Sequence, residues 1–347
     1  MPWPILMVFA AYFLVLVAIG FYFYRKNRDL EDYLLGGRRL GAWVTALSAQ
    51  ASDMSGWLLM GLPGAIYVSG LADSWIAVGL LIGTVLNWSF VAPLLRTHTA
   101  DAGAITLPSF FEARFADPTG LLRIVSAGII LLFFTIYASS GLVAAGRLFE
   151  STFDVSYPSA VLTGGAIIVL YTFMGGFLAV CWTDLFQGLL MVLALVVVPV
   201  TALGHIGGTG AILSALDARG LTGGFVPDGQ TPLLAVLSAM AWGLGYFGQP
   251  HILVRFMGAR SAAKIRQSRA IAIVWAAISL AGAVVIGLVG IGMFAALDIT
   301  QKEQEKVFIY MIRETMGPWL GGVMLAAILS AIMSTIDSQL IQASATL

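Results

Sequence analysis

An acidic residue, Asp53, lies in the middle of a long apolar stretch, and the small polar residues Ser48, Ser52 and Ser55 are close to it in sequence. A carboxylate at membrane depth costs roughly 2.5–3.5 kcal/mol to insert, so such a residue normally faces a cavity, pairs with a cation or relays protons. The sequence offers no evident basic partner at this depth, which favours a bound monovalent cation. The alternative is a protonated, hydrogen-bonded carboxyl with a structural role.

A second polar group occurs near the C-terminal end, where Ala331, Ser334 and Thr335 are spaced three and four residues apart. This spacing puts them on one face of a helix. If that face packs beside the Asp53 segment, the backbone carbonyls of Ala51 and Met54 complete a set of hard oxygen ligands, which suits Na⁺. Taken alone, hydroxyl residues in a membrane helix more often hydrogen-bond a neighbouring helix.

An aromatic pair with helix-breaking neighbours suggests a site for an organic molecule. Trp242 and Tyr246 are four residues apart with glycines between and after them, and Pro250 follows. Proline removes a backbone donor and so frees a carbonyl near Tyr246. With Tyr137, another polar aromatic residue at depth, this composition suits a small zwitterion, whose carboxylate favours a half-helix N-terminus and whose ammonium favours carbonyls or rings. Core packing or an interfacial belt is the alternative.

The elements that must position these residues are transmembrane helices. Of the 347 residues, 59% are hydrophobic and 10% are charged, with no net charge, which excludes a soluble enzyme and a nucleic-acid-binding protein. The sequence contains no phosphate-binding loop and no nucleophile or metal motif of an enzyme. We predict an all-α polytopic membrane protein with nine apolar runs: 3–24, 42–68, 74–95, 123–147, 158–180, 184–206, 232–254, 271–297 and 319–342.

The basic residues predict the orientation of these runs. Thirteen of the 18 Lys and Arg lie in or beside the connections after the first, third, fifth and seventh runs. The positive-inside rule therefore puts those connections in the cytoplasm and the N-terminus outside. Arg255 is expected to anchor the seventh connection at the lipid headgroups, and Asp337 to lie at the cytoplasmic mouth. Asp184, after a Gly175-Gly176 pair, either caps a helix or senses a cation.

Two runs share an internal repeat, because Leu-Ser-Ala-Gln-Ala at 47–51 returns as Leu-Ser-Ala-Met-Ala at 237–241. Both copies precede a stretch that an uninterrupted helix would avoid, and they are five runs apart, as an inverted repeat of five helices requires. We therefore divide the chain into 1–40, with an extra helix and the first cytoplasmic loop, a first repeat at 41–206, and a second repeat at 207–347. The second repeat then ends after its third helix, so a longer natural protein is expected.

At these residues the sequence resembles the sodium/solute symporter family. The resemblance runs through almost the whole chain, in motifs at 33–41, 46–64, 132–137, 175–184, 242–251 and 333–335. It implies the inverted-repeat fold of the leucine transporter, five helices plus five, with an extra N-terminal helix. It also implies a Na⁺ site at Ala51, Met54, Ala331, Ser334 and Thr335 with Asp53 essential nearby, a proline site at Ser55, Gly56, Tyr137, Trp242, Tyr246 and Pro250, and a cytoplasmic gating role for Arg38.

The leading hypothesis is therefore a secondary active transporter, not an enzyme, that imports L-proline with Na⁺ across the inner, cytoplasmic membrane by alternating access. Na⁺ is the coupling ion and no cofactor is implied. The alternatives are a Na⁺ symporter for another small solute, such as pantothenate or a sugar, and a transporter-like sensor that binds solute and signals without moving it.

Overall fold

The chain folds as a bundle of helices in this computed structural model, which describes residues 3–26, 29–153, 155–221, 224, 232–294, 297 and 303–346. Within those residues the structure has no strand, and an isolated β-bridge joins Leu40 to Ala259. Six helical stretches are long and apolar enough to cross a membrane, judged by length and composition. The prediction of an all-helical protein with several apolar helices is confirmed.

Four predicted runs correspond to single long helices, although the end of the eighth run falls partly outside the described residues. These helices are α1 (Trp3–Tyr24), α8 (Leu121–Phe153), α13 (Ala262–Met293) and α15 (Pro318–Thr346). The fifth and sixth runs form α9 (Tyr157–His205), which is interrupted at Gly176. Gly176 has φ 64° and ψ −165°, a conformation that only glycine adopts readily, so the kink lies inside the predicted fifth run and not between the two runs.

The second run is broken at the position that the sequence predicts. Helix α3 (Ala42–Met54) ends at Ser55, and the chain continues through η2 (Gly56–Leu58) into α4 (Gly61–Ser69). Ser55 has φ 52°, a left-handed value that costs a non-glycine residue about 1–3 kcal/mol and that concentrates at functional sites. Its Oγ atom accepts a hydrogen bond from the Trp57 amide at 3.1 Å, which stabilises the break.

The seventh run is broken as well. It consists of α11 (Pro232–Met240), the 3₁₀-helical segment η5 (Ala241–Phe247) and α12 (Pro250–Gly258). The third run follows η3 (Gly70–Asp73) and stays helical but changes type, through α5 (Ser74–Leu86), the π-helical turn η4 (Asn87–Val91) and the start of α6 (Ala92–Asp101). Pro250 begins α12 at a position where a missing backbone N–H is tolerated.

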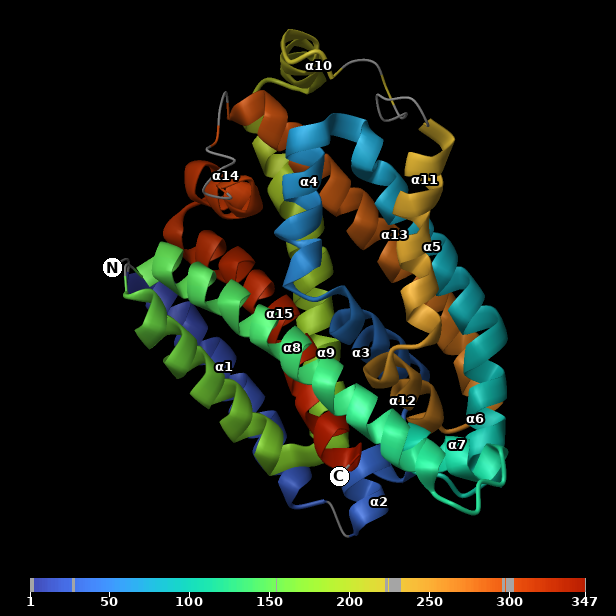
Figure 1. Cartoon of the computed structure of the whole chain (residues 1–347). Coiled ribbons are helices and arrows are strands. Elements are labelled where there is room, and N and C mark those ends of the chain that lie inside the picture. The colour runs from blue at the N-terminus through green and yellow to red at the C-terminus, as the bar shows by residue number, and fades with distance from the viewer. Residues whose placement is uncertain are drawn as a thin grey trace.

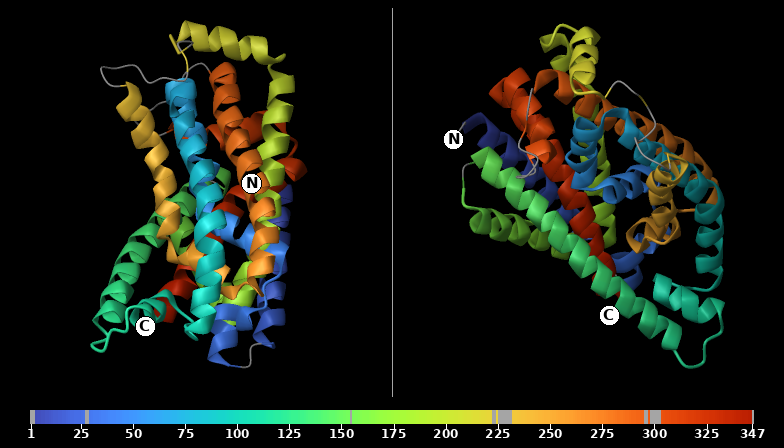
Figure 2. Two further views of the ribbon diagram at one scale, coloured as in Figure 1. Left: turned by 90° about the vertical axis from the view of Figure 1, so that its right-hand side faces the viewer. Right: turned by 45° about the horizontal axis from the view of Figure 1, so that its top comes forward.

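Short helices lie at the two ends of the bundle. Figure 1 shows α10 and α14 at the upper end and α2 and α7 at the lower end, and the side view in Figure 2 shows the long helices running between them. We call these the α14 end and the α2 end. The short elements are α2 (Leu30–Leu35), η1 (Gly36–Arg38), α7 (Leu107–Arg114), α10 (Thr209–Ala218), η7 (Glu303–Lys306) and α14 (Val307–Thr315).

Helix α15 is the most enclosed of the six membrane-length stretches and packs against α1, α3, α8 and α9. Helix α8, in contrast, exposes large apolar side chains such as Ile124, Leu132 and Phe133, as a helix facing lipid does. The packing of α15 on α3 brings Ser334 and Thr335 to the point where α3 ends.

Candidate functional site

The hydroxyl groups of α15 contact the broken end of α3. Ser334 Oγ donates to the Ala51 carbonyl at 2.9 Å, and Thr335 Oγ1 donates to the Ser52 carbonyl at 2.8 Å. Each hydroxyl also lies 3.2 Å from the Ala331 carbonyl of its own helix. Three carbonyl and two hydroxyl oxygens thus converge in a buried position. Neutral oxygen donors of this kind suit a hard monovalent cation such as Na⁺.

The structure therefore brings together four of the six residues predicted to bind sodium: Ala51, Ala331, Ser334 and Thr335. The Ser52 carbonyl, which was not predicted, takes part in the same cluster. The sequence did not indicate it because any residue type has a backbone carbonyl. Which carbonyls lose their intrahelical donor at a helix break depends on the local geometry.

Asp53 and Met54 point toward the other broken helix. Asp53 is 7% exposed, and its carboxyl lies against the Tyr246 hydroxyl. The same hydroxyl is 3.8 Å from the Met54 sulfur. The last turn of α3 therefore has two faces, one in contact with α15 and the other with η5. Tyr246, predicted to bind substrate, connects the two broken helices and is itself 5% exposed.

A cavity of about 480 Å³ begins directly beside the oxygen cluster. It is lined by four of the six predicted substrate residues, Ser55, Gly56, Tyr137 and Trp242, and also by Thr335. This volume lies in the range of small-molecule sites. The Trp242 ring stacks on Trp57 with centroids 5.2 Å apart and an interplanar angle of 30°, so one wall of the cavity joins η2 to η5.

Two charged residues that the sequence did not single out line the same cavity toward the α14 end. Arg147 Nη1 and Glu305 Oε2 form an ion pair at 2.6 Å, and both side chains are partly exposed. They are 158 residues apart, so no local pattern reveals the pair. Pro250 lines a neighbouring cavity of about 700 Å³, which shares Tyr137 and Ser140 with the first.

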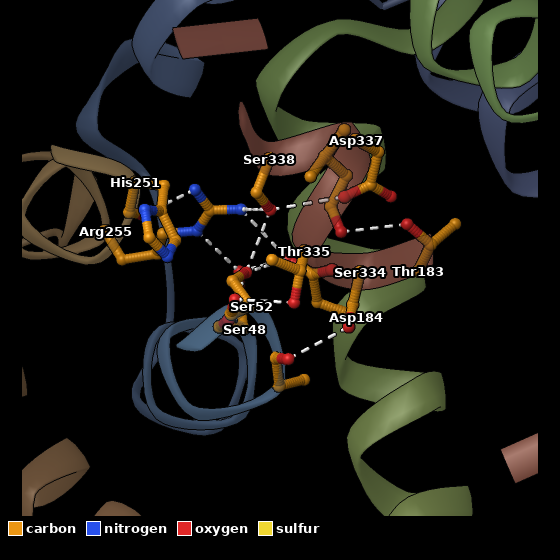
Figure 3. Close-up of polar contacts among 12 residues, drawn as sticks. Ser48, Ser52, Thr183, Asp184, His251, Arg255, Ser334, Thr335, Asp337 and Ser338 are labelled. Carbon is orange, nitrogen blue, oxygen red and sulfur yellow. Dashed lines mark hydrogen bonds and ion pairs between the residues drawn. The ribbon is translucent and has the colours of Figure 1, made fainter. Parts of the chain in front are cut away.

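A charged cluster lies behind the oxygen cluster, and Arg255 is its centre (Figure 3). The Arg255 side chain is 0% exposed. Its guanidinium donates to Asp184 Oδ2 at 3.0 Å, to Ser48 Oγ at 3.0 Å, to the His251 carbonyl at 2.6 Å and to Ser338 Oγ. The prediction that Arg255 anchors a loop at the headgroups is wrong, because α12 begins inside the bundle and its last turn remains buried.

Asp184 completes the cluster from within α9, so the alternative that it caps a helix does not hold. Its Oδ2 atom also accepts hydrogen bonds from Ser48 Oγ at 2.7 Å and from Ser52 Oγ at 3.1 Å. Because the Ser52 carbonyl also accepts from Thr335, Ser52 joins the charged cluster directly to the oxygen cluster.

Asp337 is a second buried carboxylate beside Arg255, with no exposed surface. It accepts hydrogen bonds from the Tyr171 hydroxyl at 2.6 Å and from Ser338 Oγ at 3.2 Å. The prediction that Asp337 lies at the cytoplasmic mouth is wrong, because α15 is enclosed along this stretch. Asp184 therefore pairs with the guanidinium directly, whereas Asp337 is linked to it through the Ser338 hydroxyl, and all three charged side chains are buried.

The α2 end is closed by arginine contacts to backbone carbonyls. Arg38 donates to the Met257 carbonyl at 3.1 Å and to the Ala104 carbonyl at 2.8 Å. Arg96 donates to the Ala259 carbonyl at 2.5 Å. These bonds tie the ends of α6 and α12 to the segment before α3, on the side of the molecule away from Arg147 and Glu305.

Comparison with known proteins identifies the family. The sequence pattern of the Sodium:solute symporter family matches residues 33–347. The chain is 48% identical to sodium/proline symporters of Escherichia coli and Salmonella typhimurium, over 99% of this chain and 69% of each relative. It is 46% identical to that of Staphylococcus aureus, over 99% of this chain and 67% of the relative. The chain belongs to the sodium:solute symporter family.

A solved symporter structure has a similar fold. A Na⁺-coupled sialic acid symporter, described in a substrate-bound outward-open state, matches with a TM-score of 0.84 and 18% sequence identity, over 99% of this chain and 73% of the other. The resemblance to the sodium:solute symporter family inferred from the sequence motifs is confirmed by the family match and by the identity to the sodium/proline symporters. As a member of this family of symporters, the chain is a multi-pass membrane protein and a transporter.

Proposed function

We propose that the chain carries out Na⁺-coupled import of L-proline across the cytoplasmic membrane. The observation that carries the proposal is the contact of Ser334 and Thr335 with the carbonyls at the broken end of α3, directly beside the cavity. The high identity to relatives named sodium/proline symporter over nearly the whole chain supports proline as the substrate.

The proposed architecture is the five-plus-five inverted repeat of the leucine transporter with α1 as an extra helix. The first repeat then spans 41–206 and the second begins at 207, so the breaks at Ser55 and at η5 are corresponding positions. We place the N-terminus outside and the α2 end, which carries Arg38 and Arg96, in the cytoplasm. Arg147 and Glu305 then lie toward the outside.

In this arrangement the cavity is accessible from outside and the cytoplasmic end is closed, which is one of the two states that alternating access requires. Na⁺ would be held by the carbonyls of Ala51, Ser52 and Ala331 and the hydroxyls of Ser334 and Thr335, and so would fix α3 against α15. Because Thr335 also lines the cavity, ion binding orders the wall that receives the substrate. Affinity for each ligand then rises in the presence of the other. Each Na⁺ moved inward gains about 2.3 kcal/mol per 100 mV.

The cavity offers proline groups of matching chemistry. Trp242, stacked on Trp57, presents an apolar face for the pyrrolidine ring, while Ser55 and Tyr137 supply hydroxyls for the charged ends. We propose that Tyr246 and Pro250 act on the substrate through the position of η5, because Tyr246 is buried against Asp53 and Met54 and Pro250 faces the neighbouring cavity. Arg38 is proposed to release when the cytoplasmic side opens, since it holds the end of α12.

The test is uptake of labelled L-proline into proteoliposomes that contain the full-length protein, with and without an inward Na⁺ gradient. Accumulation that needs Na⁺ and is competed by unlabelled proline supports the proposal. Competition by pantothenate or a sugar instead would change the substrate but keep the coupling. Na⁺-dependent binding without accumulation would favour a sensor.

Replacing the intramembrane carboxylate tests the coupling ion. We expect Asp53→Asn to raise the Na⁺ concentration for half-maximal uptake by about 10- to 100-fold, because a charge next to the ligand carbonyls contributes about 1–3 kcal/mol at intermediate dielectric. The matched control is Asp101→Asn, at the exposed end of α6. Normal Na⁺ dependence of the Asp53→Asn protein, at normal membrane content, would refute the role of Asp53.

A further inference from the structure

Helix α5 and the broken segment η5 approach each other more closely than side chains allow. A methyl group added at Gly83 would lie 2.3 Å from the Gly243 carbonyl oxygen, and one at Gly79 would lie 2.4 Å from backbone atoms of Met240. In the reverse direction, a methyl group at Gly243 would lie 2.1 Å from the Gly79 carbonyl oxygen. The backbone of η5 therefore rests directly on the backbone of α5.

Asn87 continues this contact one turn further along the same helix face, since residues 79, 83 and 87 are four apart. Its side chain is 2% exposed, and Nδ2 donates to the Tyr246 carbonyl at 3.0 Å. The Asn87 Oδ1 atom accepts no hydrogen bond from the described residues. The amide therefore acts here through its donor, and an amide nitrogen is the end that can face a carbonyl.

The carbonyl that Asn87 binds lies in the last turn of η5, which ends at Phe247. The last carbonyls of a helix have no N–H donor within the helix, and here the chain is extended at Gln249 before α12 begins. A buried carbonyl without a donor costs about 1–3 kcal/mol. Asn87 removes this cost, so the break between η5 and α12 has its partner at the start of η4, directly after α5.

The residue that begins the π-helical turn is Asn87 itself. Single π turns inside α-helices occur frequently at functional sites, because the wider turn changes which side chains face a neighbour. Here the α-helical part of α5 offers glycines to η5, and the π turn offers an amide at the point where η5 ends.

We infer that Asn87 is a positioning residue for the substrate site: by holding the Tyr246 carbonyl, it fixes the register of η5 on α5 and thereby the placement of Trp242 in the cavity wall. This inference rests on the proposed function for its substrate. Neither α5 nor η4 contributes a residue to that cavity. The inference nevertheless gives Asn87 an effect on substrate affinity.

The test compares Asn87→Ala and the similarly sized Asn87→Leu in proteoliposomes of the full-length protein. Both remove the donor, and the second keeps most of the side-chain volume without any group that can donate a hydrogen bond. We expect the KM for proline to rise about 5- to 20-fold, the effect of one buried hydrogen bond on the site, while the maximal rate stays within about twofold. Ser74→Ala is the control, because Ser74 is buried at the start of α5 and its hydroxyl donates locally, to the Leu71 carbonyl.

A second measurement does not depend on the substrate. Hydrogen exchange followed by mass spectrometry should show faster exchange in 241–249 for both Asn87 variants and not for Ser74→Ala. An unchanged KM together with unchanged exchange would overturn the inference, and so would a loss of maximal rate and thermal stability with the KM unaltered. If the wild-type protein does not take up proline, the proposed function fails, and the exchange measurement alone then supports or overturns the role of Asn87.

Discussion

The double substitution Ser334→Ala and Thr335→Val should raise the Na⁺ concentration for half-maximal proline uptake by about 30-fold or more, since two hydroxyl ligands at about 1–1.5 kcal/mol each are lost. Valine keeps the shape of threonine, and both side chains are buried between α15 and α3. The reduced ion affinity therefore comes from missing oxygen atoms and not from a cavity. Uptake measured as a function of Na⁺ at fixed proline gives the value.

A control on the same helix is available one turn earlier. Ser330 is equally buried, but its hydroxyl donates within α15, to the Ala326 carbonyl at 2.8 Å. Ser330→Ala should leave the Na⁺ dependence within about twofold, because the Ser330 hydroxyl bonds within α15 and does not contact the carbonyls of α3. Equal Na⁺ dependence of the double variant and this control would exclude the proposed ion site.

Removal of the buried guanidinium should have the second large effect. We expect Arg255→Leu to destabilise the protein by about 3–5 kcal/mol, because a buried carboxylate loses its partner. Asp184 would then lose its ion-pair partner, and the buried Asp337 would remain nearby with no cation to balance either carboxylate. The thermal midpoint in detergent and the folded fraction in gel filtration measure this change.

Pairing the substitution with Asp184→Asn separates charge from shape. The double variant Arg255→Leu/Asp184→Asn should recover part of the lost stability, since it removes the carboxylate that the arginine neutralises. Arg266→Leu, at an exposed position of α13, is the matched control and should stay close to wild type. If Arg255→Leu behaves like Arg266→Leu, or if Asp184→Asn brings no recovery, the charge-pair account is wrong.

Much of the site could be predicted from local sequence because its signals are local. A carboxylate at Asp53, a glycine-rich stretch and a proline disfavour a continuous helix wherever they occur, so the breaks at Ser55 and η5 follow from residue type. The contact of Ser334 and Thr335 with α3 needed one further step, the pairing of the two runs, which the repeat and the family resemblance supplied.

The charged cluster could not be predicted in the same way. Arg255 is followed by four exposed or half-buried basic residues, so by sequence it reads as part of a cytoplasmic loop. Its partner Asp184 is 71 residues away. The signal that was available is weaker: Ser48 and Ser52 are four residues apart and so share the helix face that binds both charges. Asn87 was missed because its partner is a backbone carbonyl.

Thr335 donates its hydroxyl to the Ser52 carbonyl and also lines the cavity. Thr335 therefore lies between the proposed ion site and the cavity, which bears on how tightly ion and solute movement are coupled. If Thr335 holds Na⁺ as proposed, the same side chain would restrain both slippage, in which the ion crosses alone, and premature escape of the solute. A substitution at Thr335 would then alter both properties together. The tightness of coupling between ion and solute movement would then depend in part on the side chain of Thr335.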